Sequence, residues 1–206
     1  MTKNKLFFAF MIFFAGIASA QEVRISGNQV VASDSTWIVS AGTTVLFGPN
    51  ASVEVLGGLD FQGTEEMPIS ITSLSPFEGT GLGFLINGQS NTYINLNNVV
   101  VNNLQTPFRF DPFWYRSRAT MSNVQFYENN QEFKHNAPII SVGLPFLRLE
   151  QPVALNLTGL YFANNVGGVI IDGLGQNGAN IFLNGLAFEY NEGFDDYNTP
   201  LHLELS

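Results

Sequence analysis

The amino-acid sequence predicts an all-β protein made of short strands. Charged residues make up only 12% of the 206 residues, whereas glycine (20 residues) and phenylalanine (19 residues) are abundant. After residue 21, short runs of alternating apolar and polar residues follow one another, bounded by Gly, Pro, Asn and Asp. This period of two is typical of strands. Internal repetition is the third observation, and it predicts how the strands are arranged.

The first twenty residues have the pattern of a signal peptide. Lys3 and Lys5 precede an uncharged apolar run at 6–17, and a small-residue cleavage site, ASA, ends at residue 20. The apolar run is too short to span a bilayer of about 30 Å. We therefore expect an exported, non-membrane-spanning protein with one domain at 21–206, located in the periplasm, at the cell surface or in the medium.

The charge balance excludes one class of partner. Without the two leader lysines, 6 basic and 17 acidic residues remain, which gives a net charge of −11. Such a surface repels nucleic acid, so we expect no nucleic-acid partner. The chain contains no cysteine. The fold of an exported protein must then be held by its core and its backbone pairing, without disulfides.

Several runs have the composition and alternation of strands. They contain β-branched and aliphatic residues at alternate positions and are separated by turn-forming residues. The runs are TTVLFG (43–48), ASVEVLG (51–57), PISITS (68–73), YINLNNVVV (93–101) and VALNLTGLYF (153–162).

Four segments of nine residues align without gaps. They are LNNVVVNNL from Leu96, MSNVQFYEN from Met121, LTGLYFANN from Leu157 and LNGLAFEYN from Leu183. The third position is always small or turn-forming: Asn98, Asn123, Gly159 and Gly185. The sixth position is apolar: Val101, Phe126, Phe162 and Phe188. The ninth position is asparagine in the last three segments and leucine in the first: Leu104, Asn129, Asn165 and Asn191.

A repeat of about 25 residues made of strands and turns predicts coils that stack with their backbones paired about 4.8 Å apart. Equivalent side chains then lie above one another, so the phenylalanines would stack inside and the asparagines would form an amide ladder at a turn. The spacing of 36 residues between Asn123 and Gly159 predicts a coil with an insertion of about ten residues within 131–152. The predicted fold is a right-handed, single-stranded parallel β-helix, and a β-sandwich is the alternative.

The opening of the domain resembles secreted bacterial proteins of the right-handed parallel β-helix, pectin-lyase-like kind. The resemblance covers residues 38–73, through a G-T-x-[LV] strand at 42–46, a strand pair at 48–59 and a G-T-x-x-x-P-I-x-[IF]-T-S strand at 63–73. The later coils resemble the family only through their N-[VL]-x-F-x-x-N rhythm. The family includes lyases, hydrolases, adhesins and structural repeats, so the resemblance implies a fold and not a single function.

The motifs of catalytic members of this fold are missing. Polygalacturonase-like members share N-T-D, paired Asp, G-H-G and R-I-K motifs, whereas this chain has only FDDYN at 194–198, without G-H-G or R-I-K. His135 and His202 are the only histidines, and neither has a glycine neighbour. We therefore expect a non-catalytic binding or structural module at the cell surface or outside the cell, with glycan binding as one form. A polysaccharide lyase or glycoside hydrolase is the alternative.

An acidic group near the end of the domain is the candidate metal site. Glu192, Asp195 and Asp196, with Glu189 nearby, supply carboxylate oxygens, which calcium prefers. The rhythm of a defined calcium loop is missing, so a solvated turn is the other interpretation. We expect no other cofactor.

The segment PFRFDPFWYRSR (107–118) contains five aromatic residues and three of the six arginines and lysines of the mature chain. Alternation predicts that Phe108 and Phe110 point into the coil. The candidate binding residues are Arg109, Trp114, Tyr115, Arg116 and Arg118. Aromatic rings beside guanidinium groups suit stacking on sugar rings or anchoring a partner protein. A polysaccharide or a cell-surface protein is therefore the expected partner.

The chain ends on TPLHLELS (199–206), which is strand-like and has no evident cap. An uncapped end of a stacked sheet can pair with another chain. End-to-end self-association, or continuation in a longer protein, are the two expectations that follow.

Overall fold

The computed structural model describes nine segments of the chain. They are residues 21–74, 80–87, 92–110, 118–129, 140–143, 154–166, 169–172, 180–191 and 201–203. These segments contain eighteen strands and no helix. The all-β class predicted from the sequence is therefore confirmed for the described residues.

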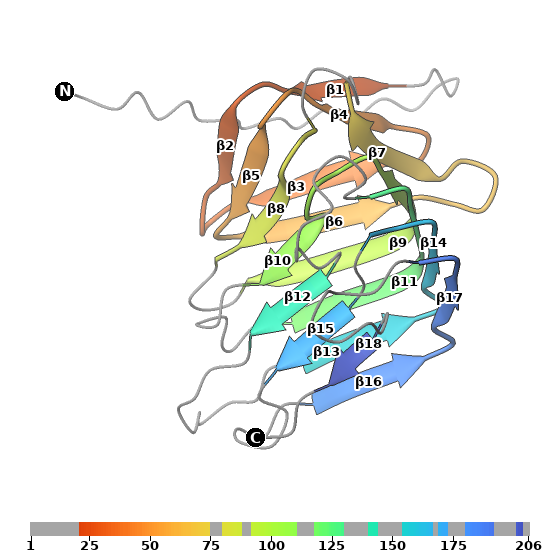
Figure 1. The fold of residues 1–206 in the computed structure, drawn as a ribbon. Helices are drawn as coiled ribbons and strands as arrows, with labels where there is room; N and C mark the ends of the chain where they lie inside the picture. The colour runs from red at the N-terminus through yellow and green to blue at the C-terminus, as the bar shows by residue number, and fades with distance from the viewer. Residues whose placement is uncertain are drawn as a thin grey trace.

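The strands form three parallel ladders, and the chain visits the ladders in turn (Figure 1). We call one passage of the chain through all three ladders a rung. The first ladder contains β1 (Glu22–Ile25), β4 (Thr44–Phe47), β7 (Ile69–Ser73), the second halves of β9 (Tyr93–Asn102) and β11 (Arg118–Tyr127), β14 (Tyr161–Ala163) and β17 (Ala187–Glu189). The second ladder contains β2 (Asn28–Val31), β5 (Ser52–Val55), β8 (Gly83–Ile86), β10 (Phe108–Phe110), β12 (Ile140–Gly143), β15 (Val169–Asp172) and β18 (Leu201–Leu203). The third ladder contains β3 (Thr36–Ser40), β6 (Gly58–Gln62), the first halves of β9 and β11, β13 (Ala154–Thr158) and β16 (Asn180–Asn184).

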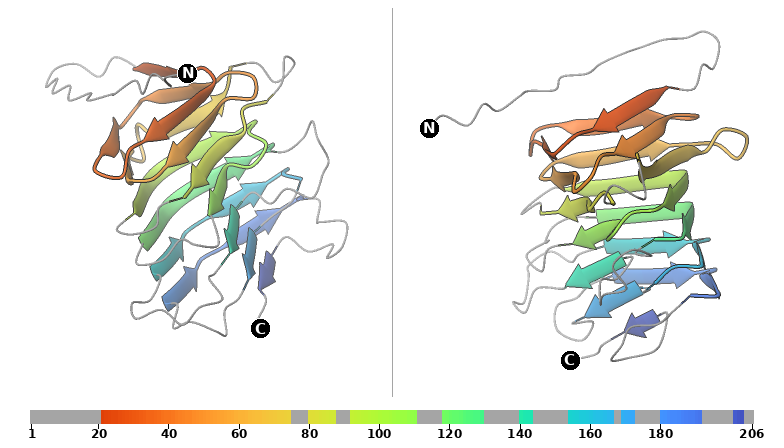
Figure 2. Two further views of the ribbon diagram at one scale, coloured as in Figure 1. Left: turned by 90° about the vertical axis from the view of Figure 1, so that its left-hand side faces the viewer. Right: turned by 45° about the horizontal axis from the view of Figure 1, so that its top comes forward.

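The second ladder is a separate seven-stranded sheet, whereas the first and third ladders are joined into one eleven-stranded sheet. The long strands β9 and β11 make this junction because each runs through the third ladder and continues into the first. The rungs follow one another from the N-terminal to the C-terminal end of the molecule (Figure 2).

The register of the ladders is the one that the repeat alignment predicts. Met121 pairs with Leu96 on one side and with Leu157 on the other, and Leu157 pairs with Leu183. Met121 and Leu157 thus remain paired although more residues separate them than separate the other paired positions. The residues on either side of β12, where the insertion was predicted, lie outside the described residues.

The third position of each repeat is where the chain bends from the third ladder into the first. The backbone φ angles there are 49° at Asn98, 53° at Asn123, 62° at Gly159 and 65° at Gly185. Asparagine and glycine adopt this left-handed conformation more readily than other residues do. The run predicted at 153–162 is consequently two strands, because the bend at Gly159 separates β13 from β14.

The left-handed bend predicts a specific response to substitution. We expect Asn123→Val to lower the free energy of unfolding by about 1–3 kcal/mol, because a β-branched side chain is strained at positive φ. Asn123→Gly should stay within about 0.5 kcal/mol of the wild type. Urea unfolding of both variants, beside Thr120→Val on the same strand as a control, measures the difference. Equal stability of Asn123→Val and Asn123→Gly would contradict this account.

Alternating strand residues place one apolar row of each ladder in the core. Phenylalanines that are equivalent in neighbouring rungs stack on one another, as the repeat predicted. The ring centroids of Phe126 and Phe162 lie 4.8 Å apart with an interplanar angle of 7°, and those of Phe162 and Phe188 lie 4.8 Å apart at 10°. In the second ladder, Phe84 and Phe108 stack at 5.0 Å. Phe108 and Phe126 form a T-shaped pair with ring centroids 6.2 Å apart, which connects the two stacks.

The predicted amide ladder is present at the end of the first ladder. Asn129 and Asn165 are buried, and the Oδ1 atom of Asn165 accepts hydrogen bonds from the backbone N–H and the Nδ2 atom of Asn129, both at 3.0 Å. Asn191 repeats this arrangement toward Asn165, at 3.0 and 2.9 Å. Leu104, the exception in the alignment, donates its backbone N–H to Asn129 Oδ1 at 3.0 Å. The backbone therefore enters the amide ladder even where the side chain is not an asparagine.

Candidate functional site

Alternation along β10 places the residues of the aromatic and arginine segment that the structure describes. Phe108 and Phe110 are 0% and 1% exposed, so the prediction that they point into the core is confirmed. Arg109, between them, is exposed and lies in register with Leu85 of β8 and Ser141 of β12. The start of the segment is thus a regular strand of the second ladder.

Arg118 lies on another ladder. It is the first residue of β11 in the third ladder, where it is exposed and pairs in register with Tyr93 and Ala154. Trp114, Tyr115 and Arg116 lie outside the described residues. The structure therefore places two of the five candidate binding residues, both at the surface, on different ladders.

The candidate calcium ligands Glu192, Asp195 and Asp196 lie outside the described residues, as does His135. Within the part of the chain that the structure describes, no three His, Asp or Glu residues form a group that could hold a metal ion. The backbone of His202 pairs with that of Ile170 in β18 and β15. The calcium site stays a prediction.

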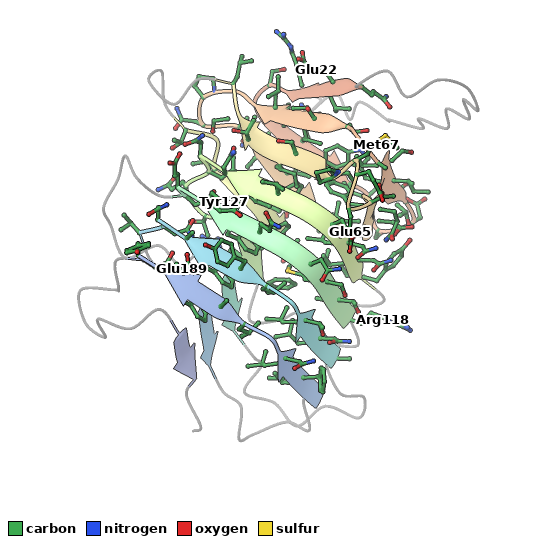
Figure 3. All side chains as sticks on the ribbon, turned by 90° about the vertical axis from the view of Figure 1, so that its right-hand side faces the viewer. Glu22, Glu65, Met67, Arg118, Tyr127 and Glu189 are labelled. Carbon is green, nitrogen blue, oxygen red and sulfur yellow. The ribbon has the colours of Figure 1, made fainter. Side chains whose placement is uncertain are left out.

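The first ladder displays a cluster of side chains that the sequence reasoning did not identify. Gln125 and Tyr127 of β11 are paired with Tyr161 and Ala163 of β14, and Glu189 of β17 is paired with Ala163. Because each strand contacts the next, residues that are up to 64 positions apart in the sequence share one face. Tyr127 and Glu189 lie on the same side of the sheet, and Arg118 lies at the other end of β11 (Figure 3). We call Gln125, Tyr127, Tyr161, Glu189 and the adjoining Tyr190 the tyrosine patch.

Hydrogen bonds and ring packing hold the tyrosine patch together. The Tyr161 hydroxyl donates to Glu189 Oε2 at 2.6 Å, and the Tyr127 hydroxyl donates to Gln125 Oε1 at 2.9 Å. The rings of Tyr127 and Tyr161 meet edge to face, with centroids 5.6 Å apart. Both rings are half-buried, whereas Gln125 and Glu189 are exposed. The tyrosines are therefore fixed in orientation but still reachable from solvent.

Tyr190 differs from the other members because its backbone is left-handed. Its φ angle is 52°, and its side chain is 88% exposed. The equivalent positions in the preceding rungs are Asn103, Glu128 and Asn164, also with positive φ. A bulky aromatic residue is unfavourable in this conformation. Because the side chain is mostly exposed, burial of the ring offsets little of this conformational cost.

Glu189 raises the pKa of Tyr161 to about 12, chiefly through the hydrogen bond from the tyrosine hydroxyl to the carboxylate. Loss of the phenolic proton would remove the hydrogen bond and place two negative charges side by side. Because the pKa is raised in the folded protein, the stabilising contact is fully present below pH 10 and is lost as the pH rises toward 12.

This pKa shift predicts the effect of Glu189→Gln. The substitution removes the negative charge, so we expect the pKa of Tyr161 to fall from about 12 toward 10.0. Ultraviolet titration of tyrosinate, with Tyr161→Phe to identify the transition of this residue, measures the change. An unaltered Tyr161 transition in Glu189→Gln would mean that the carboxylate is not its partner.

The outward side chains of the third ladder form a second ordered surface, which is mostly polar and also exposes the apolar side chains of Ile38 and Phe182. Asp60 Oδ1 accepts hydrogen bonds from Gln62 Nε2 at 2.7 Å and from Asn95 Nδ2 at 3.0 Å. The Tyr93 side chain crosses the neighbouring rung at Gly58, and its hydroxyl lies 2.9 Å from Thr36 Oγ1. A Cβ atom at Gly58 would lie 2.6 Å from the Tyr93 ring, so a larger residue there would displace the Tyr93 side chain.

Comparison of the chain with protein-family models, with curated proteins and with solved structures gave no match. The resemblance of residues 38–73 to pectin-lyase-like proteins therefore stays a prediction. Among the described residues, no helix is long and apolar enough to cross a membrane.

Proposed function

We propose that this chain is an exported, right-handed parallel β-helix of the pectin-lyase-like kind that acts as a non-catalytic binding module and binds glycans. The cleaved leader, residues 1–20, would deliver it to the periplasm, the cell surface or the medium. Three parallel ladders with a repeating register support the fold. A crossover connection between parallel strands of one sheet is almost always right-handed, which supports the handedness.

The observation that carries the binding function is the ordered display of uncharged polar and aromatic side chains on two neighbouring ladders. On the third ladder, amides and hydroxyls such as Asn95 and Tyr93 are already held by hydrogen bonds. On the first ladder, Tyr127 and Tyr161 present rings with fixed orientations. Side chains that are ordered before binding lose little conformational entropy when a ligand arrives. Hydroxyl-rich ligands such as glycans match this mixture of hydrogen-bonding groups and ring faces.

A glycan array tests the proposal. The protein recovered after export of the full chain is applied with and without Ca²⁺, and each glycan that binds is then examined for cleavage products. Retention without products is the expected result. Unsaturated or newly reducing ends would instead indicate the alternative, a lyase or hydrolase, and no retention on any glycan would refute glycan binding.

The aromatic and arginine segment is tested in the same assay. If Trp114 and Arg116 contribute as the sequence predicts, a Trp114→Ala, Arg116→Ala double variant binds less glycan at unchanged thermal stability. Unchanged retention would remove this segment from the binding surface without affecting the proposed function itself.

A further inference from the structure

The tyrosine patch contains groups suited to one class of glycan. The face of a sugar ring that carries several C–H groups is apolar and packs on an aromatic ring, while its hydroxyl groups need hydrogen-bonding partners. Tyr127 and Tyr161 supply half-buried rings held in place by their hydroxyl contacts. Gln125 and Glu189 are exposed beside them. Only one oxygen of Glu189 receives the Tyr161 hydrogen bond, and a carboxylate can accept several.

The identity of Tyr190, an exposed aromatic residue at a turn position, is a second indication of binding. The residue keeps a left-handed backbone at φ 52° while 88% of its side chain is in solvent. Packing within the described residues therefore does not account for an aromatic residue at this position. The equivalent residues Asn103, Glu128 and Asn164 also have positive φ, so the coil accounts for the backbone conformation but does not require an aromatic side chain there. Tyr190 directly follows Glu189, whose carboxylate accepts the hydrogen bond from Tyr161, so its backbone adjoins the other members of the patch.

Charge decides which glycans fit. Glu189 lies in the patch, Glu128 adjoins Tyr127 and is exposed, and the whole chain carries a formal charge of −9. Among the described residues, Arg109 and Arg118 lie on the other two ladders, and Arg24 forms an ion pair with Glu22 at 2.6 Å. An acidic polysaccharide would be repelled at this surface.

We propose that the tyrosine patch binds a neutral polysaccharide, with its sugar rings packed on Tyr127, Tyr161 and Tyr190 and its hydroxyl groups hydrogen-bonded to Gln125 and Glu189. This inference rests on the proposed glycan-binding function and assigns it a site and a ligand class. The rigid part of the site is built on β11, β14 and β17, whose backbones are paired in register.

Affinity electrophoresis in gels containing mixed-linkage β-glucan, xyloglucan or polygalacturonate tests both the class and the site. The wild type should be retarded by at least one of the two neutral polysaccharides and not by polygalacturonate. Tyr161→Ala and Tyr190→Gly should each weaken this retardation at least about tenfold. Val30→Ala, at an exposed residue of β2 in the second ladder, should bind like the wild type.

Tyr190→Gly separates binding from folding. Glycine relieves the left-handed strain, so the Tm of this variant should equal or exceed that of the wild type while its binding weakens. A fall in binding together with a fall in Tm would indicate a structural role and overturn the assignment of Tyr190.

The outcomes distinguish the inference from the function on which it rests. Retardation by a neutral polysaccharide that survives both tyrosine substitutions overturns the site but leaves the glycan-binding function intact. Stronger retardation by polygalacturonate overturns the ligand class. If the protein is retained neither in these gels nor on the glycan array, the proposed function is refuted, and the inference with it.

Discussion

Asn165→Ala is expected to lower the free energy of unfolding by about 3–5 kcal/mol. In the folded protein, Asn165 Oδ1 accepts hydrogen bonds from the N–H and Nδ2 of Asn129 at 3.0 Å. Its own Nδ2 donates to Phe126 O and to Asn191 Oδ1, both at 2.9 Å. Every polar atom of this buried side chain is therefore used, and the side chain links its own rung to the rungs on both sides.

The size of the effect follows from what the substitution leaves behind. The N–H of Asn129 and the carbonyl oxygen of Phe126 would remain in the core without the partners they have now. Each buried polar group that loses its partner costs about 1–3 kcal/mol. A methyl group cannot replace any of these contacts, and neighbouring strands hold the rungs apart, so the gap cannot close.

Urea unfolding monitored by circular dichroism measures the loss. The matched control is Asn156→Ala, an exposed asparagine on β13, which should change the free energy of unfolding by no more than about 0.5 kcal/mol. Similar small losses in both variants would mean that the amide ladder contributes little to stability.

Phe162→Ala is the second substitution with a large expected effect, a loss of about 3–5 kcal/mol in the free energy of unfolding. The Phe162 side chain is fully buried and is stacked on both sides, between Phe126 and Phe188, at centroid distances of 4.8 Å. Its removal would leave a cavity that the two remaining rings cannot fill, because each is fixed by its own strand.

Phe188→Ala provides the comparison for this prediction. Phe188 belongs to the same column but is only half-buried and stacks on Phe162, so we expect a loss of about 1–2 kcal/mol. Thermal and urea unfolding of the two variants in parallel measure the difference. If Phe188→Ala were as damaging as Phe162→Ala, burial in the stack would not explain the cost.

The repeat alignment predicted much of the architecture because it compared residues that stack. The spacings between Leu96, Met121, Leu157 and Leu183 are the strand registers that the structure contains. The third position of the repeat is small or turn-forming in the sequence, and all four residues at this position have positive φ. These features depend on backbone conformation and side-chain period, which are local properties of the chain.

The candidate binding residues were harder to predict. Arg109 and Arg118 are close in sequence, yet they occupy different ladders, because β10 belongs to the second ladder and β11 begins in the third. The tyrosine patch was missed although its members lie within the aligned repeats. Tyr127 and Tyr161 stand at outward positions of β11 and β14, and comparing only the inward columns of the repeats left them out. Reading the outward positions of the same alignment would have found them.

The sequence by itself determined which side chains point inward, where the chain bends and which rungs are equivalent, because alternation and left-handed turns act over a few residues. Only the tertiary structure decided that Tyr161 donates a hydrogen bond to Glu189 and that its ring meets Tyr127. Those contacts depend on side-chain orientation across rungs, and repeats of similar length can bring very different outward residues together. The alternation of apolar and polar residues therefore predicts the core of this protein. Its candidate binding surface depends on which outward side chains the stacked rungs bring together.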